Sequence, residues 1–304
     1  MNVLVTGGTG FVGREVLRQL VPTGHRIRLL VRNPQAPALN GLPGHDALEF
    51  CGGAITDAVS LPAAVEGIDA VIHLVGIISE VGGNTFEAVH ARGTADLVRA
   101  AARAGVSRFV HMSALGTRPH AAARYHQTKW AGEEAVRAGG IPWTILRPSL
   151  IYGPGDQSVN FFERISRWSP VLPVMGPGRA RLQPVSVDAV AQSFVSALTL
   201  PAAMGQTLDV CGEERLTFPE ILRTMLTVVG RRRLLVHVPW PLARMQAVLA
   251  EAVFAGLLGQ APPLNRDQLI MLAEDNIGDA EPARGLFGLR LESFRDGISR
   301  YLRR

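Results

Sequence analysis

A stretch near the start of the chain decides the fold: Val3-Leu4-Val5-Thr6-Gly7-Gly8-Thr9-Gly10-Phe11-Val12-Gly13. Its apolar beginning predicts a buried strand, and residues 14–20 after it predict a helix. Gly7 and Gly10 can take backbone angles closed to other residues, and Gly13 lets the helix pack closely against the strand. A glycine-rich turn that opens a helix predicts a site for the pyrophosphate of a dinucleotide. The alternative is an ordinary turn with incidental glycines.

Strand-like and helical segments keep alternating after this turn. Helices are predicted at residues 58–65 and 85–104, and strands at residues 26–31, 49–57 (with a turn), 70–76, 108–114 and 143–146. Strands that alternate with helices of this length are joined by right-handed crossovers, so the pattern predicts an α/β fold with a doubly wound parallel sheet. Ligands of such sheets bind beyond the carboxyl ends of the strands.

The end of the second predicted strand indicates which dinucleotide binds. Arg32 follows this strand, and no Asp or Glu lies between Glu15 and Asp46. A carboxylate at this place binds the ribose of NAD, whereas an arginine accommodates the additional phosphate of NADP. We therefore predict NADP(H) rather than NAD(H), with a solvated loop cation as the alternative for Arg32. Gly76, at the end of the fourth strand, is placed to let the cofactor come close.

A tyrosine and a lysine mark a second part of the predicted site. Lys129 is the single lysine of the chain, the other thirty basic residues being arginine, and it follows Tyr125 by four positions. On a helix this spacing puts a phenol and a compact ammonium on one face. Ser113 ends the fifth predicted strand, so its hydroxyl is expected at the same edge of the sheet. The alternative is a surface lysine at an accidental spacing.

Composition and charge narrow the classes of protein. The net charge of +5 and the isoelectric point near 10 fit an anionic partner. The arginines are spread along the chain without interleaved aromatic residues, so no nucleic-acid binding is predicted. Cys51 and Cys211 lie far apart, which predicts free thiols, and the chain starts without a leader, so we expect a cytoplasmic protein. No metal site is predicted, because His73 and His111 are expected as buried, hydrogen-bonded residues of adjacent strands.

The second half of the chain predicts a smaller domain. Proline and glycine are frequent from residue 153 to 178, which predicts long loops over the strand ends. Helical patterns at 216–229, 242–258 and 293–302 then predict a small, mostly helical C-terminal domain. We expect an NADP-binding domain formed by residues 1–155 and 182–204. A smaller substrate or partner domain is expected to be formed by residues 156–181 and 205–304. Segment 242–258 is apolar apart from Arg244, Gln246 and Glu251, and predicts a core or subunit-interface helix, with membrane-surface contact as the alternative.

These landmarks resemble those of the extended or atypical short-chain dehydrogenase/reductase superfamily. Residues 6–13 are similar to its Thr-Gly-x-x-Gly-x-x-Gly signature, and Tyr125 with Lys129 matches its Tyr-x-x-x-Lys motif. Residues 147–156 and 184–191 resemble later landmarks of the superfamily. Within it, three short stretches look most like the branch of the dehydrogenase-like accessory subunit of respiratory complex I and its bacterial NAD(P)-binding relatives: residues 73–76, 110–114 and 275–276.

The resemblance implies a fold and a set of site residues. The fold is a Rossmann-type sheet, and the implied cofactor contacts are Gly7, Thr9, Gly10, Phe11, Val12, Gly13, Arg32, Gly76 and Lys129. Tyr125 would exchange a proton with a carbonyl or hydroxyl group, and the positive charge of Lys129 would bring the pKa of the phenol toward neutrality. Ser113 would bind the substrate oxygen. In extended members this hydroxyl falls one place later, where the chain has Ala114, so Ser113 or Thr117 is the substitute; His90 stands where an asparagine is common.

Two hypotheses for the function follow from the resemblance. The first is an NADP(H)-dependent oxidoreductase or epimerase/dehydratase that acts on a small carbonyl, hydroxyl or sugar-nucleotide compound. The second is a non-catalytic NADP(H)-binding protein with an accessory, assembly or redox-sensing role in a respiratory or membrane complex, which Ala114 favours. Peripheral contact with a membrane or a multi-subunit complex belongs to the second hypothesis. The sequence defines neither the substrate nor the oligomeric state.

Overall fold

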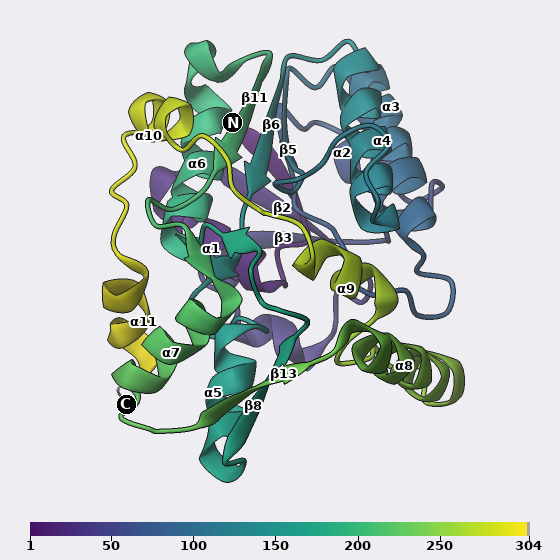
Figure 1. Cartoon of the computed structure of the whole chain (residues 1–304). Coiled ribbons are helices and arrows are strands. Elements are labelled where there is room, and N and C mark those ends of the chain that lie inside the picture. The colour runs from purple at the N-terminus through teal and green to yellow at the C-terminus, as the bar shows by residue number, and fades with distance from the viewer. Residues whose placement is uncertain (303–304) are drawn as a thin grey trace.

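The apolar segments of the first half of the chain form the centre of the molecule, a seven-stranded sheet whose paired strands all run parallel (Figure 1). The computed structural model describes residues 1–302. The sheet has the order β3-β2-β1-β4-β5-β6-β11, and its strands are β1 (Asn2–Thr6), β2 (Arg26–Val31), β3 (Leu48–Gly52), β4 (Ala70–His73), β5 (Arg108–Met112), β6 (Trp143–Pro148) and β11 (Gln206–Val210). The predicted doubly wound parallel sheet is confirmed.

Strand β1 lies between β2 and β4, so the strand order reverses at this point. A crevice forms where connections leave a sheet in opposite directions, and ligands bind there beyond the carboxyl ends of the strands. The glycine-rich turn after β1 and the loop after β4 both begin at this edge. The topology therefore brings together two segments that were predicted to hold a cofactor.

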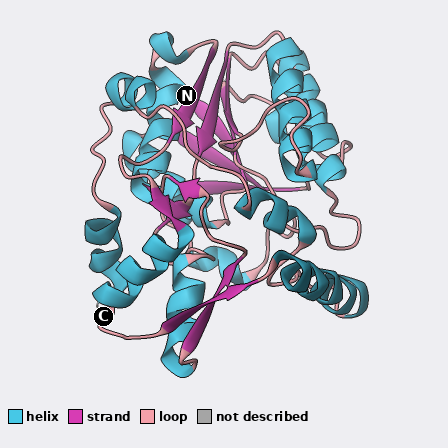
Figure 2. Ribbon diagram, viewed as in Figure 1, coloured by secondary structure: helices cyan, strands magenta, loops and turns pink. Residues whose placement is uncertain are grey.

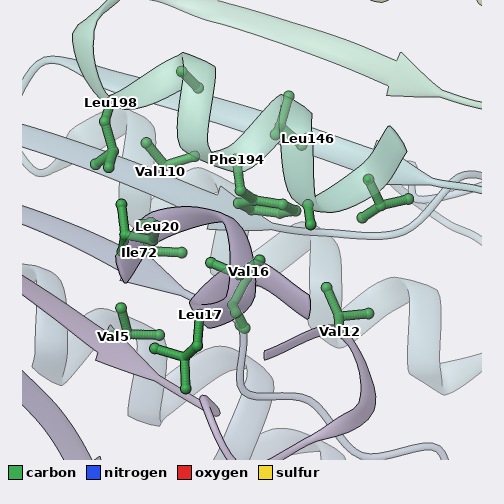
Figure 3. Packing of buried hydrophobic residues seen from close by; sticks show 14 of the residues in the cluster. Val5, Val12, Val16, Leu17, Leu20, Ile72, Val110, Leu146, Phe194 and Leu198 are labelled. Carbon is green, nitrogen blue, oxygen red and sulfur yellow. The ribbon is translucent and has the colours of Figure 1, made fainter. Parts of the chain in front are cut away.

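Helices cover both faces of the sheet (Figures 1 and 2). One face carries α1 (Phe11–Leu20), α6 (Val187–Thr199) and α10 (Glu281–Phe287), and the other carries α2 (Leu61–Val65), α3 (Gly93–Arg103) with a preceding π-helical turn (Glu87–Arg92), and α4 (Arg124–Ala138). Figure 3 shows the first core, where Val16 and Leu17 of α1 and Phe194 of α6 pack against the strands. Burying each such side chain contributes about 1.5–3 kcal/mol.

The C-terminal part is mixed, with helices predominating, and lies below the sheet in Figure 1. Its helices are α5 (Val159–Trp168), α7 (Phe218–Val228), α8 (Trp240–Ala250), which continues as a π-helical segment (Glu251–Leu257), α9 (Arg266–Leu272) and α11 (Phe294–Leu302). Short ladders accompany them: β7 (Ile151–Tyr152) with β10 (Val185–Ser186), β9 (Arg181–Leu182) with β12 (Leu216–Thr217), and β8 (Val171–Met175) with β13 (Leu234–Val238).

Two boundaries of the predicted domains are wrong. Strand β11 was assigned to the smaller domain but forms the edge of the main sheet beside β6, and α10 packs on β11 and α6. The predicted long loops contain helix α5 and strand β8. The helix begins there because buried Asp156 accepts hydrogen bonds from the backbone N–H of Ser158 and Val159. The last residues of the predicted smaller domain, 303–304, lie outside the described part.

Candidate active site

The glycine-rich turn after β1 is built by close backbone approach. Gly7 has a φ of +78°, and a Cβ atom there would lie 3.0 Å from the carbonyl carbon of Leu74 and the nitrogen of Val75 in the loop after β4. A Cβ on Gly13 would lie 2.2 Å from the oxygen of Gly7. Gly10 differs from the prediction, because its φ of −75° is open to any residue. What favours glycine there is space, since a Cβ would come within 3.3 Å of the oxygen of Gly7.

The turn leaves the start of α1 open. Gly10 is the N-cap, and no side chain caps the helix, so its first N–H groups are free to bind an anion. Thr9 is exposed, whereas Val12 is buried and directs its side chain into the core (Figure 3). Phe11 is half-buried, and its ring lies beside Gly153, where a Cβ would be 3.3 Å away. A glycine cradle over an uncapped helix start fits the pyrophosphate of a dinucleotide.

Arg32 and Gly76 lie at the carboxyl ends of β2 and β4. Arg32 is exposed, and within residues 1–302 its guanidinium has neither an ion pair nor a hydrogen bond. Gly76 is adjacent to the ammonium of Lys129, because a Cβ on Gly76 would lie 3.1 Å from the Nζ atom. The structure thus brings Lys129 of α4 to the loop that follows β4.

Lys129 is a buried lysine with 2% of its surface exposed. Its Nζ donates a hydrogen bond to the backbone oxygen of Met112 at the end of β5, at 3.0 Å. Burial lowers the pKa of Lys129 to about 8, and the negative charge of Glu133 partly opposes this shift. The side chain is therefore held across the strand ends, and the alternative of a surface lysine is excluded.

Tyr125 lies half-buried among aromatic rings. Its ring makes edge contacts with Phe86, His90 and His126, with centroids 5.9, 5.3 and 5.1 Å away. Burial raises the pKa of Tyr125 to about 12, and Lys129 is not among the causes of the shift. The predicted lowering of this pKa by Lys129 is thus wrong, because removal of the phenolate from water dominates the shift.

The predicted hydroxyl partner lies in a short chain of polar contacts. Ser113 is 2% exposed, and its Oγ donates to Thr117 Oγ1 at 3.4 Å. Thr117 in turn contacts Nδ1 of His126 at 3.4 Å. The two hydroxyls that could substitute for the residue at Ala114 are therefore neighbours. His126 follows Tyr125 directly in α4, so the chain of contacts reaches the helix that carries the phenol.

His90 connects the loop after β4 to helix α4. The backbone N–H of Ile77 donates to His90 Nε2 at 3.0 Å, so the proton of the neutral ring is on Nδ1. Nδ1 donates to Thr128 Oγ1 at 3.1 Å, and Thr128 donates to the backbone oxygens of Arg124 and Tyr125 at 3.0 Å each. Burial lowers the pKa of His90 to about 2. His90 thus stays neutral and links the loop after β4 to helix α4.

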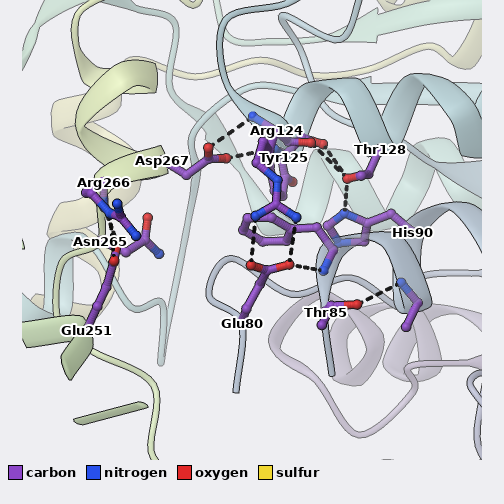
Figure 4. A network of polar contacts seen from close by, with 12 residues as sticks. Glu80, Thr85, His90, Arg124, Tyr125, Thr128, Glu251, Asn265, Arg266 and Asp267 are labelled. Carbon is purple, nitrogen blue, oxygen red and sulfur yellow. Dashed lines mark hydrogen bonds and ion pairs between the residues drawn. The ribbon is translucent and has the colours of Figure 1, made fainter. Parts of the chain in front are cut away.

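The C-terminal segment supplies contacts that the sequence did not indicate (Figure 4). Asp267 of α9 accepts hydrogen bonds from the backbone N–H groups of Arg124 and Tyr125, at 3.0 and 2.7 Å. It caps α4 in place of Ala123, whose side chain cannot. Asn265 Nδ2 donates to the oxygen of Ile78 and to Ser79 Oγ, both at 2.8 Å. The only sequence signal was the resemblance of the neighbouring residues 275–276 to one branch of the superfamily.

Asn276 holds the loops after the next two strands. Its Nδ2 donates to the oxygen of Leu115 at 2.8 Å, and its Oδ1 accepts from Ser149 Oγ at 2.8 Å. Together with Asn265 and Asp267, it makes the segment 265–276 a strap across the carboxyl ends of β4, β5 and β6. We use the name strap for this segment below.

Other polar clusters belong to the interior. His73 and His111 stack with centroids 5.2 Å apart, as adjacent strands predicted, and His73 bonds to Thr6 and Thr94. Both nitrogens of buried His111 lack a partner within the described residues, so the expected hydrogen bonding is wrong for this ring. Cys51 and Cys211 are free thiols, as predicted. Residues 1–302 contain no group of three or more side chains placed to hold a metal ion.

Two surface cavities lie outside this site. The first has a volume of about 440 Å³ and lies between α4 and the sheet edge at β11, and its lining includes Trp130 and Arg147. The second has a volume of about 520 Å³ and lies between α5 and α7, and its lining includes Glu163 and Arg231. None of the predicted site residues lines either cavity. The candidate active site is therefore defined by its residues at the strand ends.

Comparison with known proteins identifies the family of the chain. Residues 7–168 match the model of a family described as NAD(P)H-binding. A ceramide reductase of Caulobacter vibrioides is 34% identical over 79% of this chain and 74% of its own length. A 3β-hydroxysteroid dehydrogenase/Δ5→4-isomerase of Mycobacterium tuberculosis is 33% identical over 84% and 75%. Subunit 9 of the 1 alpha subcomplex of mitochondrial NADH dehydrogenase [ubiquinone] from Arabidopsis thaliana is 27% identical over 90% and 70%.

A solved structure shows the same fold. The UDP-glucose 4-epimerase of Thermotoga maritima superposes with a TM-score of 0.77 over 99% of this chain and 97% of its own, at 20% identity. The chain therefore belongs to the NAD(P)H-binding family, whose members here are Rossmann-fold proteins of the short-chain dehydrogenase/reductase superfamily. Within that superfamily it is of the extended type, and its relatives include the complex I subunit.

Proposed function

We propose that the protein is an NADP(H)-dependent reductase of an apolar carbonyl compound, with Tyr125 as the proton donor. The observation that carries the proposal is the position of Lys129, one helical turn after Tyr125. Its ammonium lies beside Gly76, in the loop after β4 that also approaches Gly7 of the glycine-rich turn, at the point where the strand order reverses. A bound nicotinamide supplies the hydride in such a reaction. The chain's own residues then have to hold the carbonyl group and deliver a proton to its oxygen.

The state of Tyr125 supports the direction of reduction. Because burial raises the pKa of the phenol to about 12, Tyr125 is protonated throughout the neutral range and can donate to a carbonyl oxygen that gains charge. The reverse reaction needs the phenolate, which this surrounding disfavours. Edge contacts with three rings fix the plane of the phenol, and within residues 1–302 its hydroxyl has no hydrogen-bond partner. The hydroxyl is thus free for a substrate.

Lys129 and Ser113 complete the proposed set. The Nζ of Lys129 lies beside Gly76 and has a single partner within residues 1–302, the oxygen of Met112, so further donors remain for a ribose hydroxyl. Ser113 lies at the end of β5 and, with Thr117, offers a hydroxyl to the substrate oxygen. Such a donor stabilises the negative charge that develops on the oxygen during reduction.

The preference for NADP(H) rests on Arg32. The guanidinium is exposed, unpaired in the described residues and placed directly after β2, where the 2′ position of the adenosine ribose lies in dinucleotide folds. No carboxylate follows β2 that would bind the free hydroxyls of NAD. A phosphate group would complete the hydrogen bonding of Arg32.

An apolar substrate is supported by the relatives. The names of two of the relatives over 30% identical designate enzymes of a sphingolipid and of steroids, and this chain covers about three quarters of each. We therefore place long-chain and polycyclic ketones ahead of sugar nucleotides.

The test is oxidation of NADPH with a panel of ketones and aldehydes that includes long-chain, steroid and sugar-derived compounds. Tyr125→Phe keeps the ring contacts and removes the proton, so we expect kcat to fall about 100-fold or more while NADPH still binds. Tyr152→Phe is the matched control, because Tyr152 is buried against Phe294 away from this site. Unchanged turnover in Tyr125→Phe would remove this residue from the mechanism. NADPH binding without turnover of any compound would favour the accessory or redox-sensing role.

A further inference from the structure

The helix that begins at Trp240 turns its large apolar side chains outward. Of the predictions for residues 242–258, a core helix is wrong, whereas a subunit interface and membrane-surface contact stay open. Most of the large side chains are exposed: Leu242, Met245, Val248, Leu249, Val253, Leu257 and Leu258. Leu249 is 58% and Leu257 is 82% exposed. We call this set the apolar face of α8. A monomeric soluble protein rarely exposes so many contiguous large apolar side chains without a partner.

Small residues attach the helix to the rest of the molecule. Only Ala243 and Ala247 of α8 are buried, and they pack in a small cluster with Leu269 of α9. In an ordinary surface helix the large apolar side chains face inward and polar ones face outward. In α8 this arrangement is inverted, because the small residues face inward and the large apolar ones face outward. The outer face of the helix is therefore suited to burial against an apolar partner. Figure 1 shows the helix at the periphery of the molecule, apart from the sheet.

The charges around the apolar face are positive. Helix α8 and its π-helical continuation carry two charged residues, Arg244 and Glu251. Glu251 forms an ion pair with Arg266, in which the Nε of Arg266 lies 2.8 Å from the Oε2 of Glu251. Arg244 is exposed. From residue 221 to residue 266 the sequence has no other carboxylate. An apolar face with a cationic margin complements an anionic lipid surface.

We propose that the apolar face of α8 lies on a lipid bilayer, with Arg244 at the level of anionic headgroups. No helix of residues 1–302 is long and apolar enough to cross a membrane, so the contact is peripheral. A second copy of the chain fits less well, since a two-fold contact through this face would bring the arginines together without a carboxylate to pair with them. A bilayer offers both an apolar interior and negative charge.

The membrane contact adjoins the strap over the candidate active site. Arg266 binds Glu251 of the helix, and the next residue, Asp267, caps the helix that carries Tyr125 (Figure 4). Resting on the proposed function, this arrangement puts the helix that carries Tyr125 next to the bilayer in which an apolar ketone dissolves. The lipid contact itself does not depend on turnover, and its test uses no substrate.

The experiment is flotation of the full-length protein with vesicles of equal parts phosphatidylglycerol and phosphatidylcholine, and with phosphatidylcholine alone. Met245→Glu with Leu249→Glu puts two carboxylates into the apolar face, and we expect binding to fall at least about ten-fold. Val59→Glu is the matched control, because Val59 is 88% exposed in the turn before α2 and is not part of the apolar face of α8. Arg244→Gln is expected to reduce binding to anionic vesicles and to leave the weak binding to neutral vesicles unchanged.

Unfolding temperature and NADPH affinity, measured on each variant, show that the fold is intact. Loss of vesicle binding in the double variant alone supports the proposal. Equal binding in wild type and double variant, or no binding by wild type, overturns it. Sedimentation velocity gives a further outcome: a wild-type dimer that the double variant converts to a monomer, without vesicle binding, would show that the apolar face of α8 joins two copies and would also overturn the proposal.

Discussion

The glycine-rich turn and the start of helix α4 form opposite parts of one site and are held in different ways. The turn is fixed by backbone atoms close to it, such as the oxygen of Gly7 under Gly13. The start of α4 is fixed from outside, by Asp267, which lies 142 residues after Tyr125. The glycine-rich turn is therefore rigid by local geometry, whereas the position of the phenol of Tyr125 depends on the docking of the C-terminal segment.

This difference predicts where the two parts respond to change. A substitution in the turn damages the backbone itself, so the fold and the cofactor site are lost together. A substitution in the strap leaves the cofactor site intact and changes only the helix that carries Tyr125. The following predictions separate the two parts, from the largest expected effect to the smallest.

Gly13→Ala is expected to have the largest effect. The new Cβ would lie 2.2 Å from the oxygen of Gly7 and 2.6 Å from the Cα of Gly8, and neither backbone atom can move without opening the turn. We expect the free energy of unfolding to fall by about 3 kcal/mol or more. Denaturant unfolding measures it, with Gly41→Ala as the control, since a Cβ there meets nothing within 4 Å. Equal stability of the two variants would contradict the local account of the turn.

Lys129 connects the two parts, and its ionisation gives the second effect. Burial lowers its pKa to about 8, so between pH 8 and 10 the unfolded chain, where the pKa is near 10.5, binds more protons than the folded protein. Lys129 therefore makes the free energy of unfolding rise with pH in this window, by at most about 3 kcal/mol in total, and the raised pKa of buried Cys211 opposes this rise above about pH 9. Above pH 10 the trend reverses, because burial raises the pKa of Tyr125 to about 12.

The measurement for Lys129 is urea unfolding from pH 8 to 10, compared with Lys129→Met. The variant keeps the length of the side chain and loses the charge, so the rise with pH should be absent from it. Parallel curves for the two proteins would mean that Lys129 is not buried as a titrating group.

Arg32 tests the cofactor part without disturbing its backbone. Arg32→Ser removes an exposed guanidinium that has no partner in the described residues, and we expect NADPH affinity to fall about ten-fold while NADH affinity stays the same. Calorimetric titration gives both constants. Arg26→Ser, at the other end of β2, is the control. Tighter binding of NADH than of NADPH by the wild type would refute the assignment to NADP(H).

A substitution of Asp267 tests the start of helix α4, and its expected effect is the smallest of the four. Asp267→Ala leaves the N–H groups of Arg124 and Tyr125 without their cap, which costs about 1 kcal/mol. We expect faster amide exchange at the start of α4 and a lower kcat, with unchanged NADPH affinity. Glu274→Ala, which removes only the exposed ion pair with Arg118, is the control. A change in NADPH affinity equal to that in kcat would show that the two parts are not separable.

The same difference explains how much could be predicted from the sequence. Local patterns gave the strands, the turn and the spacing of Tyr125 and Lys129, because periodicity and glycine placement act over a few residues. Strand β11 was missed since it joins β6 only after a long detour. For α8 the sequence left a core, an interface and a membrane-surface helix open, because composition does not tell a buried apolar helix from one with an outward apolar face. Asp267 and Asn265 gave no local signal for contacts across the strand ends.

The buried position of Lys129 has a consequence for proteolysis. The chain contains one lysine, so a lysine-specific endoprotease has a single cleavage site, inside a helix and shielded from solvent. The native protein should resist this enzyme, and cutting after residue 129 requires α4 to unwind first. The rate of this cut can be measured as the appearance of two fragments, and it would report how often helix α4 opens. Repeating the measurement with bound cofactor, or with variants of the strap, would show how far each of them suppresses the opening.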